Sequence, residues 1–536
     1  MSVDHKPLAR TGPSAISRRD LLRLALLGLP AGAVLAACGA APAVAPTAAP
    51  GAAPAAGATA PVAVALARAA LKASHTLEWA GKEVLAPASP LRMFPTIEML
   101  YSRLVQHDSS GRPAPDLALS WAADETAQTW TFTLREGVSF HDGKPFSSAD
   151  VAYTIRHVLD PALESPGAAV LTIIDLDSLA TPDPQTVVFR LTQPHADFPL
   201  LLLHYSCYII PEGSADTIGT TGIGTGPFKL ESFDAEGTTA VVANDDYYAG
   251  PPLVERIEIV GIADSPGRTS ALLAGQIDFD SVSQESAALV EQNPNFTLTS
   301  LPAGDWLVMA MNVTQAPFTD VRVREALKLL VDRDAMVQTV LQGYGTVTGD
   351  HPVWPGDQYF REFQRPRDVE RARALLAEAG YADGLELTLE TSDIDQAMLN
   401  MAIAYREMAA EGGVNVEVVQ HPADGYWNDI WLKVPFCTSS WGERQADQVL
   451  NEVFRSGASW NETSWNNAEF DGLLDQARKA LEFEPRKALY QQAQQLLAEN
   501  GGAIIPMFQN NLLAHRKGVA GMDQRYFDWA KISVTA

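Results

Sequence analysis

Tryptophans and an arginine gather in one stretch of the chain. Five of the eleven tryptophans fall between Trp427 and Trp465, where composition alone would place fewer than one. Indole rings offer large, rigid surfaces for a small molecule, and their N–H groups can orient it. Arg444 lies in the same stretch, and a guanidinium suits a carboxylate or phosphate because it donates two parallel hydrogen bonds. The stretch is therefore a candidate ligand site. The alternatives are core packing for most tryptophans and a solvated loop or internal ion pair for Arg444.

Patterns typical of catalytic sites are absent from the sequence. It contains no G-x-S-x-G, H-E-x-x-H, phosphate-loop or G-x-G-x-x-G motif. Gly222, Gly224 and Gly226 alternate just before a proline, which predicts a turn. The ten histidines include no pair at i, i+4 spacing, so no metal site is predicted. We therefore expect no cofactor, no metal and no enzymatic activity.

The first 37 residues have the pattern of an export signal. Arg18 and Arg19 form a twin-arginine pattern, and an apolar run follows from 24 to 37. This run is shorter than the roughly 20 residues that span a bilayer, so it predicts a signal peptide over 1–37. Its end, Leu-Ala-Ala-Cys38, resembles the bacterial lipobox, whose cysteine is diacylated. We expect Cys38 to anchor the protein to a membrane; an ordinary cleavage site is the alternative.

An alanine- and proline-rich segment follows the cysteine. Residues 39–65 carry no charge, and 14 Ala, 5 Pro and 3 Gly occupy most of the 27 positions. Prolines at this spacing interrupt any helix, and the segment has too little to bury to become ordered. We expect a tether over 38–74 between the anchor and a folded body.

The composition of the whole chain is that of an acidic globular protein. Lys and Arg number 39 against 65 Asp and Glu, a net charge of −26, and 46% of the residues are apolar. Such a surface repels nucleic acid phosphates, so a nucleic acid partner is not expected. The length suggests about three domains. The two cysteines after Cys38, Cys207 and Cys437, are expected to be buried thiols.

Strands and helices are both expected in the body, which indicates a mixed α/β or α+β fold. A capping box at Ser147 and Asp150 predicts a helix that ends before Pro161. The segment 198–211 is expected to be a buried strand or loop. Periodicity predicts strands over 129–134, 186–191 and 503–508, and helices over 323–330, 368–379, 470–481 and 485–499.

Several motifs together resemble the solute-binding proteins of peptide/nickel-type ABC importers, family 5. The similarity covers 75–536 in the order of the family. The motifs are Tyr101-Ser-Arg-Leu-Val105, Phe132-Thr-Leu-Arg-Glu-Gly-Val-Ser-Phe-His-Asp-Gly143, Gly224-Thr-Gly-Pro-Phe-Lys-Leu230, Ala271-Leu-Leu-Ala-Gly-Gln-Ile-Asp278 and Phe318-Thr-Asp-Val-Arg-Val-Arg-Glu-Ala-Leu327.

The resemblance implies a bilobal fold of the type II periplasmic-binding-protein class, in the larger cluster with an extra subdomain in the first lobe. Such lobes close around a solute and deliver it to a membrane permease and its ATPase, and the protein is expected to be a monomer. The implied limits are 75–97, 205–303 and 502–536 for the first lobe, 98–204 for the inserted subdomain, and 304–501 for the second lobe.

The resemblance also implies a ligand loop. Ser440–Asp447 aligns with the family's tryptophan-containing ligand loop, in which peptide-binding members place an aspartate that pairs with the peptide's amino terminus. Arg444 stands at that position here, between Glu443 and Asp447. We expect Arg444 to bind an acidic group of the solute, and Glu443 or Asp447 to meet any amine. The predicted ligand residues are Trp441, Glu443, Arg444, Asp447, Trp460 and Trp465.

The function implied is that of an extracytoplasmic substrate-binding lipoprotein of an ABC importer. Its solute is expected to be a peptide or a peptide-like molecule with an acidic group, since peptides are the commonest solutes in the family. Two alternatives stay open: an extracytoplasmic hydrolase, and a ligand-sensing lipoprotein on the same fold.

Overall fold

The computed structural model describes residues 68–77 and 81–535. The expected signal peptide, Cys38 and the tether as far as residue 67 lie outside the described residues. No helix in the described part of the chain is long and apolar enough to cross a bilayer.

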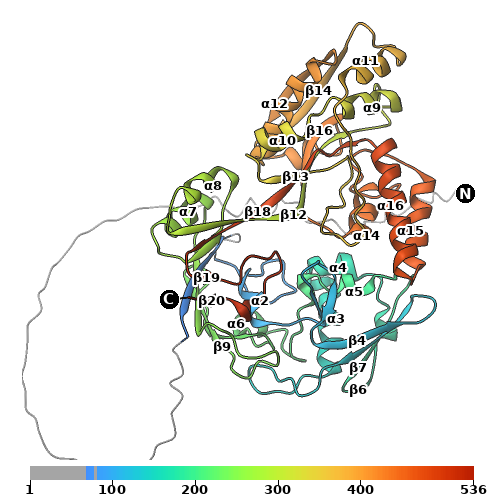
Figure 1. Ribbon diagram of the computed structural model, residues 1–536. Coiled ribbons are helices and arrows are strands. Elements are labelled where there is room, and N and C mark those ends of the chain that lie inside the picture. The colour runs from blue at the N-terminus through green and yellow to red at the C-terminus, as the bar shows by residue number, and fades with distance from the viewer. Residues whose placement is uncertain (1–67, 78–80, 536) are drawn as a thin grey trace, which may run out of the picture. The chain divides into compact units, whose positions relative to one another are not determined.

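A twelve-stranded mixed sheet extends through the molecule (Figure 1). Two of its twelve strands pair beside the main path, β13 (Gly345–Val347) with β18 and β17 (Ala503–Ile504) with β12. The main order is β15 (Val414–His421), β14 (Leu385–Ser392), β16 (Phe436–Trp441), β12 (Phe296–Met311), β18 (Met507–Arg516), β11 (Phe279–Ser281), β1 (Ala70–His75), β10 (Arg256–Gly261), β9 (Thr238–Ala243) and β8 (Phe228–Ser232).

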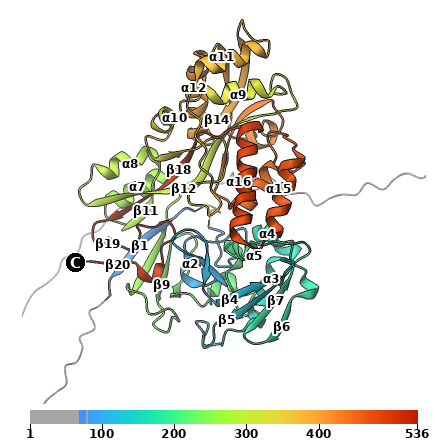
Figure 2. The same ribbon diagram turned by 45° about the vertical axis from the view of Figure 1, so that its right-hand side comes forward.

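Strands β12 and β18 connect the two lobes. The first half of β12 pairs with the end of β18, with Phe296 opposite Arg516, and its second half pairs with β16, with Met311 opposite Phe436. The register against β18 shifts between Leu301 and Asp305, where the chain passes from one lobe to the other. An irregularity of this kind bends a strand and raises its twist. Both views show the two strands side by side at this passage (Figures 1 and 2).

The second lobe packs helices against its part of the sheet, around two clusters of buried apolar side chains. The apolar residues of these helices recur at helical spacing, which places one stripe of each helix against the sheet. The helices are α9 (Val321–Leu329), α10 (Arg333–Val340), α11 (Val369–Glu378), α12 (Gln396–Ala410), α13 (Tyr426–Asp429), α14 (Ala446–Val449), α15 (Ala468–Lys479) and α16 (Phe483–Asn500).

The inserted subdomain has its own sheet and its own apolar core. Helix α3 (Ser148–Val158) covers this sheet, and both reciprocal bonds of the predicted capping box at Ser147 and Asp150 are present. The remaining elements are the sheet β4 (Ala118–Ala123), β5 (Thr129–Leu134), β7 (Thr186–Arg190) and β6 (Ala180–Asp183), the hairpin β2 (Val105–His107) and β3 (Pro113–Pro115), and the short helices α4 (Pro166–Leu171) and α5 (Phe198–Leu201).

The first lobe carries the remaining elements around a third core region. Gly224 and Gly226 pack against the backbone of Leu100 and Tyr101, where a Cβ atom would meet carbonyl atoms, so this segment is a close-packed turn as predicted. The helices are α2 (Thr96–Leu100), α6 (Ile218–Thr221), α7 (Ser265–Leu273) and α8 (Gln284–Glu291), and a small pair of strands is β19 (Val519–Ala520) and β20 (Ser533–Val534).

Four sequence expectations about the fold differ from the structure in whole or in part. The tether does not reach residue 74, because Ala70–His75 forms strand β1 and pairs in parallel with β10. The segment 198–211 is mostly buried, as expected, but it begins with the helix α5 and forms no strand; the rest is turn and loop around a short 3-10 helix at Tyr205–Cys207. The expected strand over 503–508 is two strands, separated at Ile505 and Pro506. Ile504 and Met507 pack in the core of the second lobe, so we place the return to the first lobe after residue 508 rather than at 502.

Candidate functional site

The tryptophans of the second lobe form a continuous aromatic cluster around Trp441. Its indole, at the end of β16, stacks on Trp306 of β12 with ring centroids 5.8 Å apart. Trp431 and Trp460 each lie 5.9 Å from the same ring. Trp441 is buried, whereas Trp460 is 41% exposed. The cluster therefore has a buried inner part and one ring, Trp460, that is partly exposed to solvent.

Glu462 holds two of these rings in place. Its Oε2 accepts a hydrogen bond from Trp431 Nε1 at 2.7 Å, and its Oε1 accepts one from Trp441 Nε1 at 3.1 Å. The side chain is buried, and burial raises the pKa of the Glu462 carboxyl to about 7. Sequence reasoning missed this residue. The available signal was an acidic residue in the middle of the tryptophan-rich stretch.

Arg444 lies over the aromatic cluster. Its guanidinium carbon is 5.0 Å from the centroid of Trp441 and 5.8 Å from that of Trp460. Its Nε pairs with Glu452 at 3.1 Å, and its side chain is about one fifth exposed. A cation held over two indoles and partly open to solvent can bind a carboxylate while keeping its aromatic contacts. The structure thus brings Arg444, Trp441 and Trp460 together.

Glu443 turns away from this cluster and contacts the C-terminal segment. Its Oε2 accepts a hydrogen bond from the backbone N–H of Gly304 at 2.7 Å and pairs with Arg525 at 2.6 Å. Its Oε1 accepts one from the Tyr526 hydroxyl at 2.8 Å. Burial raises the pKa of the Glu443 carboxyl, although Arg525 opposes that shift. Both oxygens of Glu443 have protein donors at the passage between the lobes, and its contact with a ligand amine stays a prediction.

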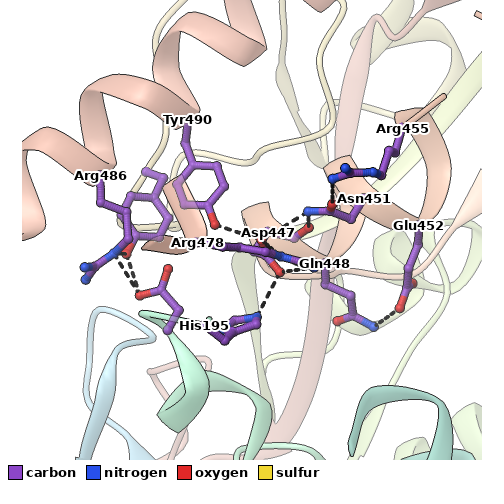
Figure 3. Close-up of polar contacts among 11 residues, drawn as sticks. His195, Asp447, Gln448, Asn451, Glu452, Arg455, Arg478, Arg486 and Tyr490 are labelled. Atoms are coloured by element: carbon purple, nitrogen blue, oxygen red, sulfur yellow. Dashed lines mark hydrogen bonds and ion pairs between the residues drawn. The ribbon is translucent and has the colours of Figure 1, made fainter. Parts of the chain in front are cut away.

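Asp447 is the centre of a buried polar network (Figure 3). Its two oxygens take a bidentate pair from Arg478, with both N–O distances 2.8 Å. Tyr490 OH donates at 2.8 Å, and His195 Nε2 lies 3.1 Å from Oδ2. Arg478 and His195 hold the pKa of the Asp447 carboxyl well below its usual range, against its burial. Both oxygens thus have protein partners among the described residues, and the expectation that Asp447 meets a ligand amine stays a prediction.

A second set of contacts, next to Asp447, joins the inserted subdomain to the second lobe. Asp197, two residues after His195, accepts a hydrogen bond from Tyr359 OH at 2.7 Å and pairs with Arg486 at 3.1 Å. The backbone N–H of Ala196 donates to the carbonyl of Arg478 at 2.8 Å. Residues 195–197 are therefore held by the second lobe through side chains and backbone together.

Trp465 lies in the core of the second lobe. It is 5% exposed and packs edge-on against Phe470, with centroids 5.2 Å apart. Its carbonyl accepts a hydrogen bond from Asn461 Nδ2 at 2.8 Å. It does not contact Arg444 in the part of the chain that the structure describes, so the alternative of core packing holds for this tryptophan.

The two later cysteines are free, buried thiols, as predicted. Burial raises the pKa of the Cys207 thiol to about 12 and that of the Cys437 thiol still further. Among the described residues, no group of His, Cys, Asp and Glu is arranged to hold a metal ion.

A cavity of about 680 Å³ lies in the first lobe and the adjoining inserted subdomain. Its walls include none of the six predicted ligand residues. Two wall residues, Arg525 and Tyr526, contact Glu443, so the cavity borders the passage between the lobes.

Known proteins resemble the chain along most of its length. The glutathione-binding protein GsiB of Escherichia coli (strain K12) is 29% identical over 426 residues, 76% of this chain and 82% of the relative. The substrate-binding protein CtaP of Listeria monocytogenes covers 88% of this chain and 100% of its own, with a TM-score of 0.77 and 20% identity. The binding protein AgaA of A. tumefaciens R10, solved with agropinic acid, covers 86% and 96%, with a TM-score of 0.65 and 25% identity.

The structural likenesses confirm the predicted fold class, a bilobal periplasmic-binding-protein fold of mixed α/β type. The family described as bacterial extracellular solute-binding proteins, family 5, middle region, matches residues 112–461. That match spans more than half of the sequence and includes most of the inserted subdomain and most of the second lobe. The chain therefore belongs to the bacterial extracellular solute-binding proteins of family 5.

Proposed function

We propose that this protein is the substrate-binding component of an ABC importer and that it captures a small, acidic, peptide-like solute. Membership of the solute-binding family supports the receptor role. A relative named for glutathione and a structure with agropinic acid show that related chains bind small acidic molecules. The permease and ATPase of the importer are the partners this role requires.

The arrangement around Arg444 is the observation that carries the choice of solute. Its guanidinium is held over Trp441 and Trp460 and pairs with Glu452. A solute carboxylate can take up the open side of this cation, and the exposed Trp460 ring can pack against apolar parts of the same solute. Trp441, which is hydrogen-bonded to Glu462, contacts both the Arg444 guanidinium and the Trp460 ring.

The test is calorimetry followed by recovery of the ligand. Glutathione and a tripeptide of alanine, which lacks an acidic side chain, are titrated into the mature protein, and the bound molecule is then released by denaturation and weighed by mass spectrometry. We expect binding of glutathione, weaker binding of the alanine peptide, and recovery of an unchanged ligand. Absence of binding heat for both would contradict the acidic peptide-like solute. Recovery of cleaved peptide would favour the hydrolase.

A sensing role makes a different prediction from a transport role. If the protein serves import, a strain that lacks its gene loses uptake of the bound solute. Retained uptake in that strain would favour the ligand-sensing alternative.

We also propose that the protein is exported by the twin-arginine route and stays outside the cytoplasm, held to a membrane by a lipid on Cys38. The support is the order of twin arginines, apolar run and lipobox in the sequence. Metabolic labelling with palmitate should mark the native chain and not the Cys38→Ser variant, which should leave the membrane fraction. A labelled Cys38→Ser chain would contradict the assignment. We propose a monomer, which sedimentation of the mature protein tests.

A further inference from the structure

Glu452 is the carboxylate that pairs with Arg444 in the second lobe. Its Oε2 lies 3.1 Å from Arg444 Nε, and its Oε1 accepts a hydrogen bond from the side-chain amide of Gln448 at 3.0 Å. Figure 3 shows the Gln448–Glu452 pair beside the network around Asp447. The Glu452 side chain is 28% exposed. This acid is therefore held in position by two protein groups and is still open to solvent.

The local helix geometry fixes where the Glu452 carboxylate lies. Helix α14 continues directly into a π-helical turn, Leu450–Phe454, that contains Glu452. Such a turn holds one residue more than an α-helical turn, and π-helical turns are frequent at functional sites. The same turn buries three apolar residues in the core of the second lobe, Leu450, Val453 and Phe454. The carboxylate is therefore carried by a turn that the core holds in place.

Arg444 and Glu452 both keep hydrogen-bonding capacity for a ligand. A guanidinium has five N–H donors, and a carboxylate has about four acceptor sites. Toward the described residues, Arg444 uses one donor on Glu452 and one on the carbonyl of Gly442, which leaves three. Glu452 accepts one bond at each oxygen from the same part of the chain. The pair is thus a positive and a negative group side by side, each of them only partly satisfied.

The other acids near Arg444 differ from Glu452 in these respects. Asp447 is buried, and its oxygens contact four other residues of the protein. Glu443 accepts bonds from three residues, and its side chain is only 11% exposed. Asp305 is half-buried and accepts the backbone N–H of Glu443 at 3.1 Å. Glu452 is the one of these four acids that combines spare acceptors, exposure and a direct contact with the Arg444 guanidinium.

A cation and an anion held side by side select the charge pattern of their ligand. A lone carboxylate is attracted by Arg444 and repelled by Glu452, so the two effects oppose each other at short range. A group with a carboxylate and an ammonium on one carbon atom matches both charges, because its carboxylate accepts from Arg444 while its ammonium donates to Glu452. The partly exposed Trp460 ring, 5.8 Å from the Arg444 guanidinium, can pack against the carbon chain that follows.

We propose that Arg444 and Glu452 together recognise an amino acid head group of the solute, a carboxylate and an ammonium on the same carbon atom, and that Glu452 binds the ammonium. This inference rests on the proposed function, since it names the part of the acidic, peptide-like solute that the second-lobe site recognises. The pair favours solutes with a free head group at one end, as in a γ-glutamyl peptide, over peptides whose amine and carboxylate lie at opposite ends.

The experiment compares two ligands that differ only in the amine. Glutathione and glutaryl-cysteinylglycine, which is glutathione without its amine, are titrated into the mature protein by calorimetry. Glu452→Gln removes the negative charge and keeps an acceptor for Gln448 or Arg444. Glu443→Gln and Asp305→Asn are the matched controls, because they neutralise two other acids close to Arg444. Circular dichroism and melting temperature show that each variant is folded, and the comparison of ligands on wild-type protein needs no variant.

We expect wild-type protein to bind glutathione at least about fivefold more tightly than the analogue, because the ammonium forms a charge-assisted hydrogen bond to a partly exposed partner. In Glu452→Gln the two ligands should bind within about twofold of each other, since glutathione loses the partner of its ammonium and the analogue loses a repulsion. Glu443→Gln and Asp305→Asn should keep the preference of the wild type.

Three results would overturn the proposal. They are equal binding of the two ligands by wild-type protein, a preference that survives in Glu452→Gln, and a preference that is lost to the same extent in Glu443→Gln or Asp305→Asn. In each of these cases glutathione still binds, so the proposed function stands and only this inference fails. Absence of glutathione binding by wild-type protein would contradict the proposed solute and this inference with it.

Discussion

Arg444 and Asp447 are three residues apart in the sequence, but they differ in burial and in their interaction partners. Asp447 is buried, and every bond its oxygens make is to a group of the protein, including His195 of the inserted subdomain. Among the residues that the structure describes, Arg444 has one carboxylate partner, Glu452; it also donates to the Gly442 carbonyl, and its side chain is about one fifth exposed. A charge whose partners are all supplied by the fold stabilises the fold, whereas a partly unsatisfied charge on a rigid base is available to a ligand.

The larger expected effect in this comparison is on the Asp447 side. Asp447→Ala removes a buried carboxylate and leaves Arg478, about one fifth exposed, without its bidentate partner, which should lower the free energy of unfolding by about 3 kcal/mol. Chemical denaturation measures this. The matched control is Asp475→Ala, because the half-exposed Asp475–Arg455 pair should be worth less than about 1 kcal/mol. Equal losses of stability in the two variants would contradict the claim that the Asp447 network stabilises the fold more than an exposed ion pair does.

Trp465 and Trp460 give a second comparison between a buried residue of the core and a partly exposed residue of the candidate site. Trp465→Ala opens a cavity in the core and should cost about 3–5 kcal/mol of stability. Trp460→Ala removes a ring that is 41% exposed, so it should cost less stability than Trp465→Ala, about 1 kcal/mol, while weakening solute binding. Thermal unfolding and glutathione titration of both variants provide the check. A Trp460→Ala protein with unaltered affinity would remove that ring from the site.

The buried carboxyl of Glu462 predicts that the stability of the protein depends on pH. Burial raises the pKa of its carboxyl to about 7, above the usual 4.5, so the folded state binds a proton more readily than the unfolded state. Its contribution to stability is therefore present below about pH 4.5 and is lost as pH rises through about 7.

Glu462→Gln removes this titration. The stability of the variant relative to wild type should rise between pH 5 and pH 8 by about 2–3 kcal/mol, at roughly 1.4 kcal/mol per pKa unit. Asp357→Asn should behave in the same direction, since burial also raises the pKa of Asp357 to about 7. Denaturation midpoints across this pH range test both, and parallel curves for wild type and Glu462→Gln would refute the assignment.

Local patterns predicted the elements of the fold well and its long-range contacts poorly. The strand at Thr129–Leu134 and the helix capped by Ser147 are specified by neighbouring residues, and both form as predicted. Strand β1 was missed because its alanines continue the composition of the tether, and only pairing with β10 makes it a strand.

The candidate site shows the same limit. Trp460 and Trp465 are the same residue type five positions apart, and only packing distinguishes the exposed ring from the buried one. The partner of Asp447, His195, is 252 residues away, so no spacing rule connects them. Arg444 was predicted as a ligand residue because its residue type, its place among the tryptophans and its place in the ligand loop all coincide, and that role stays a prediction.

The most direct test of the account is the affinity of the Arg444→Ala protein for glutathione, measured by calorimetry beside its melting temperature. The account predicts binding at least about tenfold weaker, a loss of about 1.4 kcal/mol, at a nearly unchanged melting temperature of the ligand-free protein. Arg455→Ala, which removes another second-lobe arginine with a carboxylate partner, should bind as wild type does. Unaltered affinity in Arg444→Ala would contradict the claim that this cation holds the solute.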